Sequence, residues 1–396
     1  MLRCLVLILF YFWAIANVND SLMFLGLYVA IPSSFFLSFF CKKDKVFNNT
    51  YVITFCLLFG WIALTWFTAG DFEIATTHMQ RLAGVFMMTI AVCNMATDER
   101  NVPWLYGLYI FMFCTAVYYA YTHILTFQFD IASNRLDDDR LNANVLANYT
   151  FYATFALFVM GEILNKRILC KIFKIVFLLM IPLSFIIALF TASRQVLLVQ
   201  IPLIVILLYL RYLRSKTLKM RFVFIIGVVV CAVFSLDIIS ETYDNSFLKT
   251  RNEKNIEEDG RFKVLQEAIE VGRENPIVGV GPGNFILHSS DRIFSHCSYT
   301  EVFANNGVIG LILYVFLVGY FIGKQFQYFR RTRKTSYLIF LTFGFVFAFY
   351  NFLYVFYSDI WLMSFFMFVA MNSCAVWNLQ MGIRRRIRIY ETNNTK

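Results

Sequence analysis

Apolar segments of about 20 residues recur along almost the whole chain, and this pattern leaves few folds open. A bilayer offers the backbone no hydrogen-bond partners, so an apolar run of this length predicts a membrane-spanning helix. Hydrophobic residues make up 59% of the 396 residues and charged residues only 15%, a composition far from that of soluble domains. We therefore expect an all-α polytopic integral membrane protein with about twelve transmembrane helices, at residues 3–18, 22–40, 51–69, 80–96, 103–127, 143–164, 172–191, 194–210, 221–239, 299–323, 336–357 and 359–380.

Aromatic residues and cysteines suit the same interpretation. The chain has 46 Phe and 22 Tyr, which we expect mainly on lipid-facing surfaces and at the membrane interfaces. The nine Cys show no ligand spacing, so packing inside the spans is favoured over disulfides or a metal site. The four His are not at metal-ligand spacing either, and neither a metal nor a cofactor is expected.

The distribution of Lys and Arg predicts how the chain crosses the membrane. With the N-terminus inside, the inner turns and tail hold 24 of the 35 Lys and Arg but only 5 of the 25 acidic residues. This bias marks the cytoplasmic side, so the basic runs are topology signals and a nucleic-acid partner is not expected. The predicted organisation is spans 1–9 at residues 1–239, an outer periplasmic loop at 240–298, spans 10–12 at 299–380 and a basic cytoplasmic tail at 381–396.

Most of the recognisable motifs lie in or beside the outer loop. They are, in chain order, Thr191-Ala192-Ser193-Arg194-Gln195, Asp259-Gly260-Arg261-Phe262, the glycine-rich run N-P-I-V-G-V-G-P-G-N-F at 275–285, His296-Cys297-Ser298-Tyr299-Thr300-Glu301 and Asn306-Gly307-Val308-Ile309-Gly310.

Arg194 and Arg261 are bases on a predicted outer side that is otherwise acidic. A guanidinium near hydrocarbon is costly, so Arg194 either snorkels to anchor a span end or serves a site. Ser193 beside it could bind a ligand or cap the next helix. Arg261 opens a stretch in which Phe262, Leu265, Ala268, Ile269 and Gly272 recur at helical spacing, which predicts an amphipathic helix. Arg261 at that N-terminus suits a phosphate, although a solvated helix face is equally possible.

His296 is the candidate for proton transfer. It precedes a span on the outer side, and a neutral imidazole can take a proton from a sugar hydroxyl near neutral pH. A lone interfacial histidine is the alternative. Glu301 at the start of a span is costly when charged, so we expect it to be paired or part of a site. The glycine-rich run permits a tight backbone and close approach of a ligand, with a plain surface turn as the alternative.

The order of these motifs resembles that of the O-antigen ligase/polymerase family over roughly residues 185–320; the first half of the chain matches only in its pattern of spans. The resemblance implies a membrane glycosyltransferase that uses undecaprenyl-diphosphate-linked oligosaccharide at the outer face of the bacterial inner membrane, with partners in polysaccharide assembly. Arg194 and Arg261 would bind the donor diphosphate and His296 would be the general base, with no metal. Ser193, Gly260, Tyr299 and Glu301 would line the substrate site.

Three functions remain open from the sequence. A polymerase, slightly favoured, would pass the glycan to another lipid-linked unit, and a ligase would pass it to lipid A core or another acceptor. A transporter or flippase of lipid-linked glycans is the alternative of another class. It is disfavoured because nearly all charges fall at span ends and the few Pro do not repeat in two halves.

Overall fold

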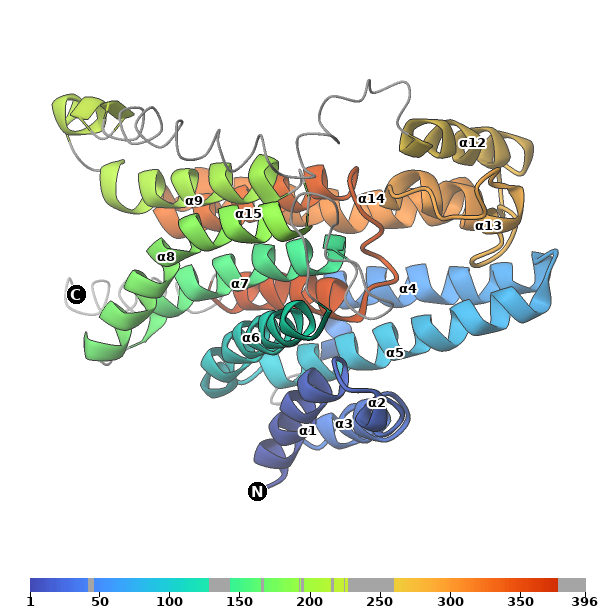
Figure 1. Cartoon of the computed structure of the whole chain (residues 1–396), viewed down its shortest axis with the longest axis horizontal. Coiled ribbons are helices and arrows are strands. Elements are labelled where there is room, and N and C mark those ends of the chain that lie inside the picture. Colours follow the sequence, from blue (N-terminus) through green and yellow to red (C-terminus); the bar gives the residue numbers. More distant parts are fainter. Residues whose placement is uncertain are drawn as a thin grey trace, which may run out of the picture.

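Helices account for all regular secondary structure in the part of the chain that the computed structural model describes, which is residues 1–41, 46–127, 143–164, 167–191, 193, 196–214, 217–223, 225–226 and 260–376. Helices α4, α5 and α14 run along the longest axis of the molecule (Figure 1). The elements are α1 (Leu2–Ala16), α2 (Asp20–Leu25), η1 (Gly26–Ala30), α3 (Ile31–Ser38), η2 (Val46–Asn48), α4 (Thr50–Thr65), η3 (Trp66–Thr68), α5 (Phe72–Ala96), η4 (Glu99–Asn101), α6 (Val102–Phe127), α7 (Ala143–Ile163), α8 (Arg167–Thr191), η5 (Val196–Gln200), α9 (Ile201–Leu208), η6 (Tyr209–Leu213), α12 (Gly260–Glu274), α13 (Phe285–His288), α14 (Ser298–Thr332) and α15 (Thr335–Tyr350).

The helices confirm an all-α, multi-pass membrane protein. Among the described residues, four shorter apolar helices occupy further predicted span positions: Leu2–Ala16, Leu198–Arg211, Thr335–Tyr350 and Ile360–Val376. The number twelve stays a prediction, because most of the predicted span 221–239 lies outside the described residues. Six helices are long and apolar enough to cross a bilayer by themselves: Asp20–Ser38, Thr50–Thr68, Phe72–Ala96, Glu99–Thr122, Ile168–Thr191 and Ser298–Thr332.

Helix α5 begins earlier than the sequence pattern predicted. The predicted span started at residue 80, but the helix starts at Phe72 because Asp71 caps it. The Asp71 carboxylate accepts from the backbone N–H of Glu73 at 2.9 Å and of Ile74 at 3.0 Å. Such a cap satisfies backbone donors at a helix start whatever the hydropathy of the first turn. The outer end of α5 therefore carries polar residues within a helix.

Helix α15 ends earlier than predicted. The predicted span ran to residue 357, whereas the helix stops at Tyr350. The Asn351 side chain donates to the Phe347 carbonyl at 2.7 Å, and the Asn351 carbonyl accepts from the Ser298 N–H at 2.8 Å. These bonds turn the chain away from the helix axis. Residues 351–359 consequently dock against the start of α14.

Residues predicted to share one side of the membrane do meet in the structure. At the predicted inner end, Arg3 pairs with Asp98, Arg211 pairs with Glu162, and Arg214 donates to Thr335 at 3.3 Å. At the predicted outer end, the turn between α4 and α5 lies at the same end of the molecule as α12 and α13 (Figure 1). The contacts agree with the predicted pairing of the turns, while the orientation itself stays a prediction.

Aromatic side chains fill the interior as well as the lipid-facing surface, which differs from the expectation for them. Phe343 and Phe366 are fully buried, and Phe347 stacks on Phe366 with ring centroids 4.3 Å apart. Buried polar groups join helices between these rings: Tyr109 bonds to Ser364 at 3.0 Å and Asn372 to Tyr106 at 2.8 Å. Ring packing and hydrogen bonds between helices both stabilise helix association, because the hydrophobic effect contributes little between helices within a bilayer.

Asp98, between α5 and α6, should contribute to stability in a pH-dependent way. Hydrogen bonds from Arg100 lower the pKa of the Asp98 carboxyl to about 2, with a further contribution from Arg3. A depressed folded-state pKa stabilises the fold above the unfolded-state pKa, and this contribution is lost as the pH falls towards 2. We expect Asp98→Asn to destabilise the protein at pH 7 by about 1–2 kcal/mol, since the guanidiniums are partly exposed. Thermal unfolding in detergent should show this difference shrinking between pH 4 and pH 2; a constant difference would contradict it.

Candidate functional site

A kink in α14 organises the predicted outer end of the molecule. Gly307 has φ 66° and ψ −170°, a conformation that other residues rarely adopt. Its neighbour Val308 donates its N–H to the Pro276 carbonyl at 2.7 Å instead of to the preceding helical turn. A Cβ atom on Gly307 would lie 2.1 Å from the Ile277 carbonyl oxygen. Only glycine allows the backbone of residues 276–278 to approach this closely.

The kink frees two carbonyl groups of α14 for the glycine-rich run. Ala304 O accepts from Val280 N and Asn305 O accepts from Gly281 N, each at 2.9 Å. The Asn305 side chain also accepts from Phe285 N at 2.9 Å. The run is therefore docked along α14 and is no plain surface turn. Its positive-φ glycines permit close approach, as predicted, but the partner in the structure is protein backbone.

Helices α4 and α5 are tied to the same kink. Trp61 and Thr65 of α4 donate to the backbone and side-chain oxygens of Asn306, at 2.8 Å and 2.9 Å. The Asn284 amide accepts from Asp71 N at 2.7 Å and donates to Asp71 O at 3.1 Å. The Asn284 side chain thus binds both the backbone N–H and the backbone carbonyl of Asp71. Segments far apart in the sequence are thus fixed together at the predicted outer end.

The predicted amphipathic helix exists as α12, which begins at Gly260 and lies over α14 and beside α13 (Figure 1). Its buried residues Val264, Ala268 and Val271 form a small core that includes Phe285 and Ala304. The buried face is shifted from the predicted stripe: Ala268 and Gly272 are buried and Leu265 and Ile269 half-buried, but Phe262 is 43% exposed. At Gly272 the Phe303 ring packs so closely on α12 that an added Cβ would lie 2.3 Å from it. Arg261 is half-buried in the first turn.

His296 is held in an unusual backbone conformation, with φ 58°. A non-glycine residue in this region costs about 1–3 kcal/mol and persists only where its surroundings impose it. Here Ser295 imposes it, because its N–H donates to Glu301 Oε2 at 2.7 Å and its hydroxyl donates to Cys297 O at 3.0 Å. The half-buried His296 ring lies 4.4 Å from the Phe294 ring.

Glu301 is buried and positions this segment. Besides Ser295, its carboxylate accepts from Asn305 Nδ2 at 2.9 Å. Glu301 was expected to be paired or part of a site; in the structure it holds the backbone next to His296 through Ser295. Asn305 in turn binds the glycine-rich run, so one carboxylate joins the His296 segment to that run through a single side chain.

Tyr299 and Ser298 connect the start of α14 to residues 351–359. The Ser298 hydroxyl donates to Tyr354 O at 2.9 Å and accepts from Phe356 N at 2.8 Å. The Tyr299 hydroxyl donates to Ala348 O at 3.0 Å, and its ring lies 4.7 Å from Phe352. The Tyr299 hydroxyl is thus engaged by the protein, which leaves its ring as the part open to a substrate.

Three buried polar side chains, those of Ser193, Asn148 and Gln200, lack hydrogen-bond partners within the described residues. Arg194 lies outside the described residues, and α8 ends at Thr191 as the interruption predicted. The Ser193 hydroxyl is buried, and within the described part of the chain it caps no helix and has no hydrogen-bond partner; the amides of Asn148 and Gln200 have none there either. Asn148 belongs to α7, which packs against η5 that holds Gln200. Buried polar atoms of this kind usually await water or a ligand.

Two polar residues of α5 join the site although the sequence did not single them out for it. A Cβ on Gly283 would lie 2.9 Å from His78 Cβ, and His78 Nε2 lies 3.5 Å from the Tyr357 hydroxyl. Arg81, one turn further, donates through Nε to Ser358 O at 3.1 Å. The signal that could have revealed them is the N-cap at Asp71, which places both in the first turns of a helix.

Comparison with known proteins agrees with the motifs. The family described as O-antigen ligase matches residues 175–315, which include the Ser193 region, α12, the glycine-rich run and the start of α14. No individual curated protein matches the chain. The matched segment contains the whole kink-centred assembly apart from α4, α5 and residues 351–359. Over this segment the chain is similar to the O-antigen ligase family, whose members transfer glycans in surface glycan assembly.

Proposed function

We propose that the chain is a polymerase-type glycosyltransferase acting on undecaprenyl-diphosphate-linked glycan at the outer face of the bacterial inner membrane. Arg194 and Arg261 bind the donor diphosphate, and His296 is the general base. The acceptor oxygen bonds to the anomeric carbon as the bond from that carbon to the diphosphate oxygen breaks. The diphosphate leaves with the electron pair, and the hydroxyl proton passes to His296. Two guanidiniums stabilise the leaving charge, so no metal enters the reaction.

The observation that supports this function most is the convergence of three motif segments on the kinked start of α14. Val264 of α12, Phe285 after the glycine-rich run and Ala304 of α14 share one small core, against which Ile293 also packs. Ser290 N donates to Glu267 Oε2 of α12 at 3.1 Å. The segments that carry Arg261 and His296 are therefore attached to one end of the molecule. Transfer chemistry requires such pre-positioning of donor and acceptor groups.

Four further residues complete the proposed substrate site. Gly260 leaves the N-terminus of α12 open to phosphate oxygens, where free backbone N–H groups favour an anion. The unpartnered Ser193 hydroxyl offers a hydrogen bond to a sugar or phosphate oxygen. The Tyr299 ring provides an apolar wall. Glu301 acts through the backbone of Ser295, which it binds, and so is a positioning residue for His296.

Arg81 extends the site with a third guanidinium. No carboxylate in the described part of the chain lies within 4 Å of it, and its Nε is already oriented by Ser358 O. The buried Asp359, which follows Ser358 in the chain, interacts electrostatically with Arg81 but makes no direct ion pair with it. A charge in a membrane-spanning helix that lacks a direct ion pair is costly and often marks a ligand pathway. Its terminal nitrogens remain available to an anionic oxygen. We assign Arg81 to binding of the diphosphate or of an anionic sugar of the glycan.

Arg81→Gln should therefore weaken transfer by roughly 10- to 100-fold, the usual effect of losing a hydrogen bond from a charged group. Steady-state kinetics with a purified lipid-diphosphate donor would measure it, and Arg81→Lys should restore part of the loss. Arg292→Gln is the control, because Arg292 is an exposed base in the segment before α14. Equal rates in Arg81→Gln and wild type would remove Arg81 from the site.

We further propose that both termini lie in the cytoplasm and the site faces the periplasm. Single cysteines at Asn48 and Arg331, introduced into a cysteine-free background, should resist a membrane-impermeant maleimide in intact cells. A cysteine at Asp291 should react. Labelling of Arg331→Cys from the periplasm would reverse the orientation and place the site on the wrong side for this reaction.

The acceptor separates the two transferase functions. With only lipid-linked repeat units present, a polymerase forms longer lipid-linked chains and releases undecaprenyl diphosphate. A ligase needs lipid A core or another acceptor and forms a glycan no longer attached to the carrier. Incubating the purified protein with each acceptor in turn, with a chelator present, tests the polymerase assignment. Product only on lipid A core would show a ligase, and loss of activity on chelation would refute the metal-free mechanism.

A further inference from the structure

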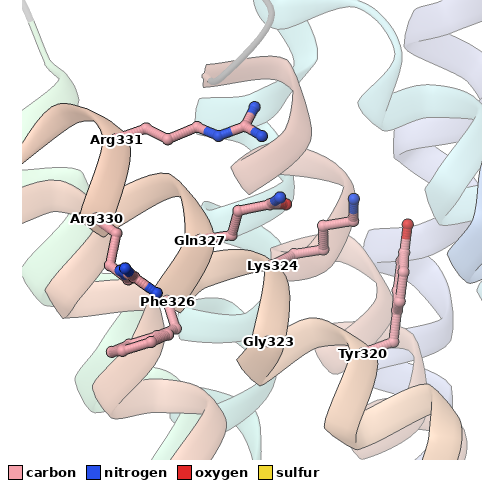
Figure 2. Close-up of a pocket in the computed structure, with 7 residues that line it drawn as sticks. All are labelled: Tyr320, Gly323, Lys324, Phe326, Gln327, Arg330 and Arg331. Atoms are coloured by element: carbon pink, nitrogen blue, oxygen red, sulfur yellow. The ribbon is translucent and has the colours of Figure 1, made fainter.

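The end of α14 remote from the kink carries a polar stripe that the transfer reaction does not use. Tyr320, Lys324, Gln327 and Arg331 recur at spacings of four, three and four residues, which places them on one helix face. Figure 2 shows Lys324, Gln327 and Arg331 extending towards the same side of the helix. Polar side chains so aligned at a span end can meet one ligand together.

This stripe borders a hollow of about 620 Å³. The described residues that line it include three cations and no acid. Within the described part of the chain, no carboxylate lies within 4 Å of any of the three. Two of the cations lie over aromatic rings, Lys324 Nζ 5.3 Å from the Tyr320 centroid and Arg330 Cζ 6.0 Å from that of Phe326. The lining consists of Tyr320, Gly323, Lys324, Phe326, Gln327, Arg330 and Arg331 (Figure 2).

The surface of α14 that leads from the hollow towards the kink is apolar and open. Ile312 is 60% and Phe316 49% exposed. A Cβ added at Gly319 or at Gly323 would meet no atom within 4 Å. Each glycine leaves a gap on the helix surface, and nothing in the described protein fills it. A long apolar chain could lie in this gap with its polar end among the cations.

We propose that this end of α14 binds an anionic glycerophospholipid. The phosphate contacts Lys324 and Arg331, with Arg330 nearby, and one acyl chain lies along Gly323, Gly319 and Phe316. Positive charge at the membrane surface attracts anionic lipids in general, and a site that also accommodates the chain selects them individually. The inference stands on the α14 surface alone and does not depend on the proposed transfer reaction.

The test uses the full-length protein in detergent with an equimolar mixture of phosphatidylglycerol and phosphatidylcholine, and counts retained lipids by native mass spectrometry. Wild type should retain phosphatidylglycerol preferentially. Lys324→Gln combined with Arg331→Gln should lower that preference by roughly tenfold or more, given the contribution of each basic residue at a membrane surface. Gly323→Leu should also lower it, because its side chain fills the acyl position while every charge is kept.

Arg333→Gln combined with Lys334→Gln is the matched control, since both are exposed bases at the same helix end that do not line the hollow. This pair should leave the preference unchanged. An equal loss in the control would show that only surface charge matters and would overturn the site. No preference in wild type, unchanged preference in Gly323→Leu, or displacement of the lipid by millimolar inorganic phosphate would also overturn it.

Discussion

His296→Asn is expected to lower glycan transfer by roughly 10²–10⁴-fold, the usual contribution of a positioned general base. Asn cannot accept the proton at neutral pH, yet it tolerates the left-handed backbone that this position requires. The segment should therefore stay folded, with Asn at position 296 keeping the φ of 58°. Binding of the lipid-diphosphate donor should remain, because we assign donor binding to the arginines and not to His296. Single-turnover transfer and donor binding, measured on the same preparation, separate the two effects.

Two variants make the His296 result specific. His296→Ala should show a similar loss of transfer, with added destabilisation because Ala tolerates positive φ poorly. Arg292→Ala, with φ 55° at an exposed position of the same loop, controls for strain and charge in this segment and should leave transfer near wild type. A His296→Asn protein with full activity would show that another group takes the proton.

Gly307→Ala is expected to destabilise the protein by more than about 3 kcal/mol, a size reserved for changes with a definite steric cause. The added Cβ would lie 2.1 Å from the Ile277 carbonyl oxygen, and φ 66° disfavours any side chain. Relief requires residues 276–278 to leave α14, which breaks the Val308–Pro276 hydrogen bond. The glycine-rich run would then separate from the segment that carries His296, and transfer should be lost with the fold.

Chemical denaturation in detergent micelles measures this effect directly. Gly319→Ala is the matched control: it lies on the same helix, lacks positive φ and has open space around its Cβ position. Because Ala is the better helix former, the control should be neutral or more stable by about 0.5–1 kcal/mol. Equal stability of Gly307→Ala and Gly319→Ala would contradict the role given to the kink.

The sequence predicted the helical membrane class and the presence of α12, because both depend on local patterns of apolar residues. It did not predict where α5 starts, since hydropathy does not register the N-cap at Asp71. It also missed the docking of the glycine-rich run on α14, which depends on backbone bonds from Val280 and Gly281 to carbonyls freed at Gly307. A glycine pattern indicates positive φ but does not identify the partner segment.

Some residues of the candidate site could likewise be predicted from the sequence and others could not. Arg261 and His296 could be nominated because they stand in motifs beside predicted spans. The N-cap at Asp71 could have placed Arg81 in a helix, but not in the candidate site, because that place depends on Ser358, a residue far away in the sequence that reaches Arg81 only where α15 stops at Tyr350. Local patterns specify helices and caps, whereas a site assembled from α5, α14 and residues 351–359 exists only after packing.

Transfer by purified protein reconstituted in sealed vesicles tests the central claim most directly. The donor, an undecaprenyl-diphosphate-linked repeat unit with a radiolabelled sugar, is added to the outer leaflet together with an unlabelled lipid-linked acceptor. Only molecules whose predicted periplasmic face points outward can use it, and these are scored by labelling Asp291→Cys. We expect longer labelled chains and one undecaprenyl diphosphate released per bond formed. Labelled donor that crosses to the inner leaflet with no lengthening of its glycan would instead show a transporter and contradict the account.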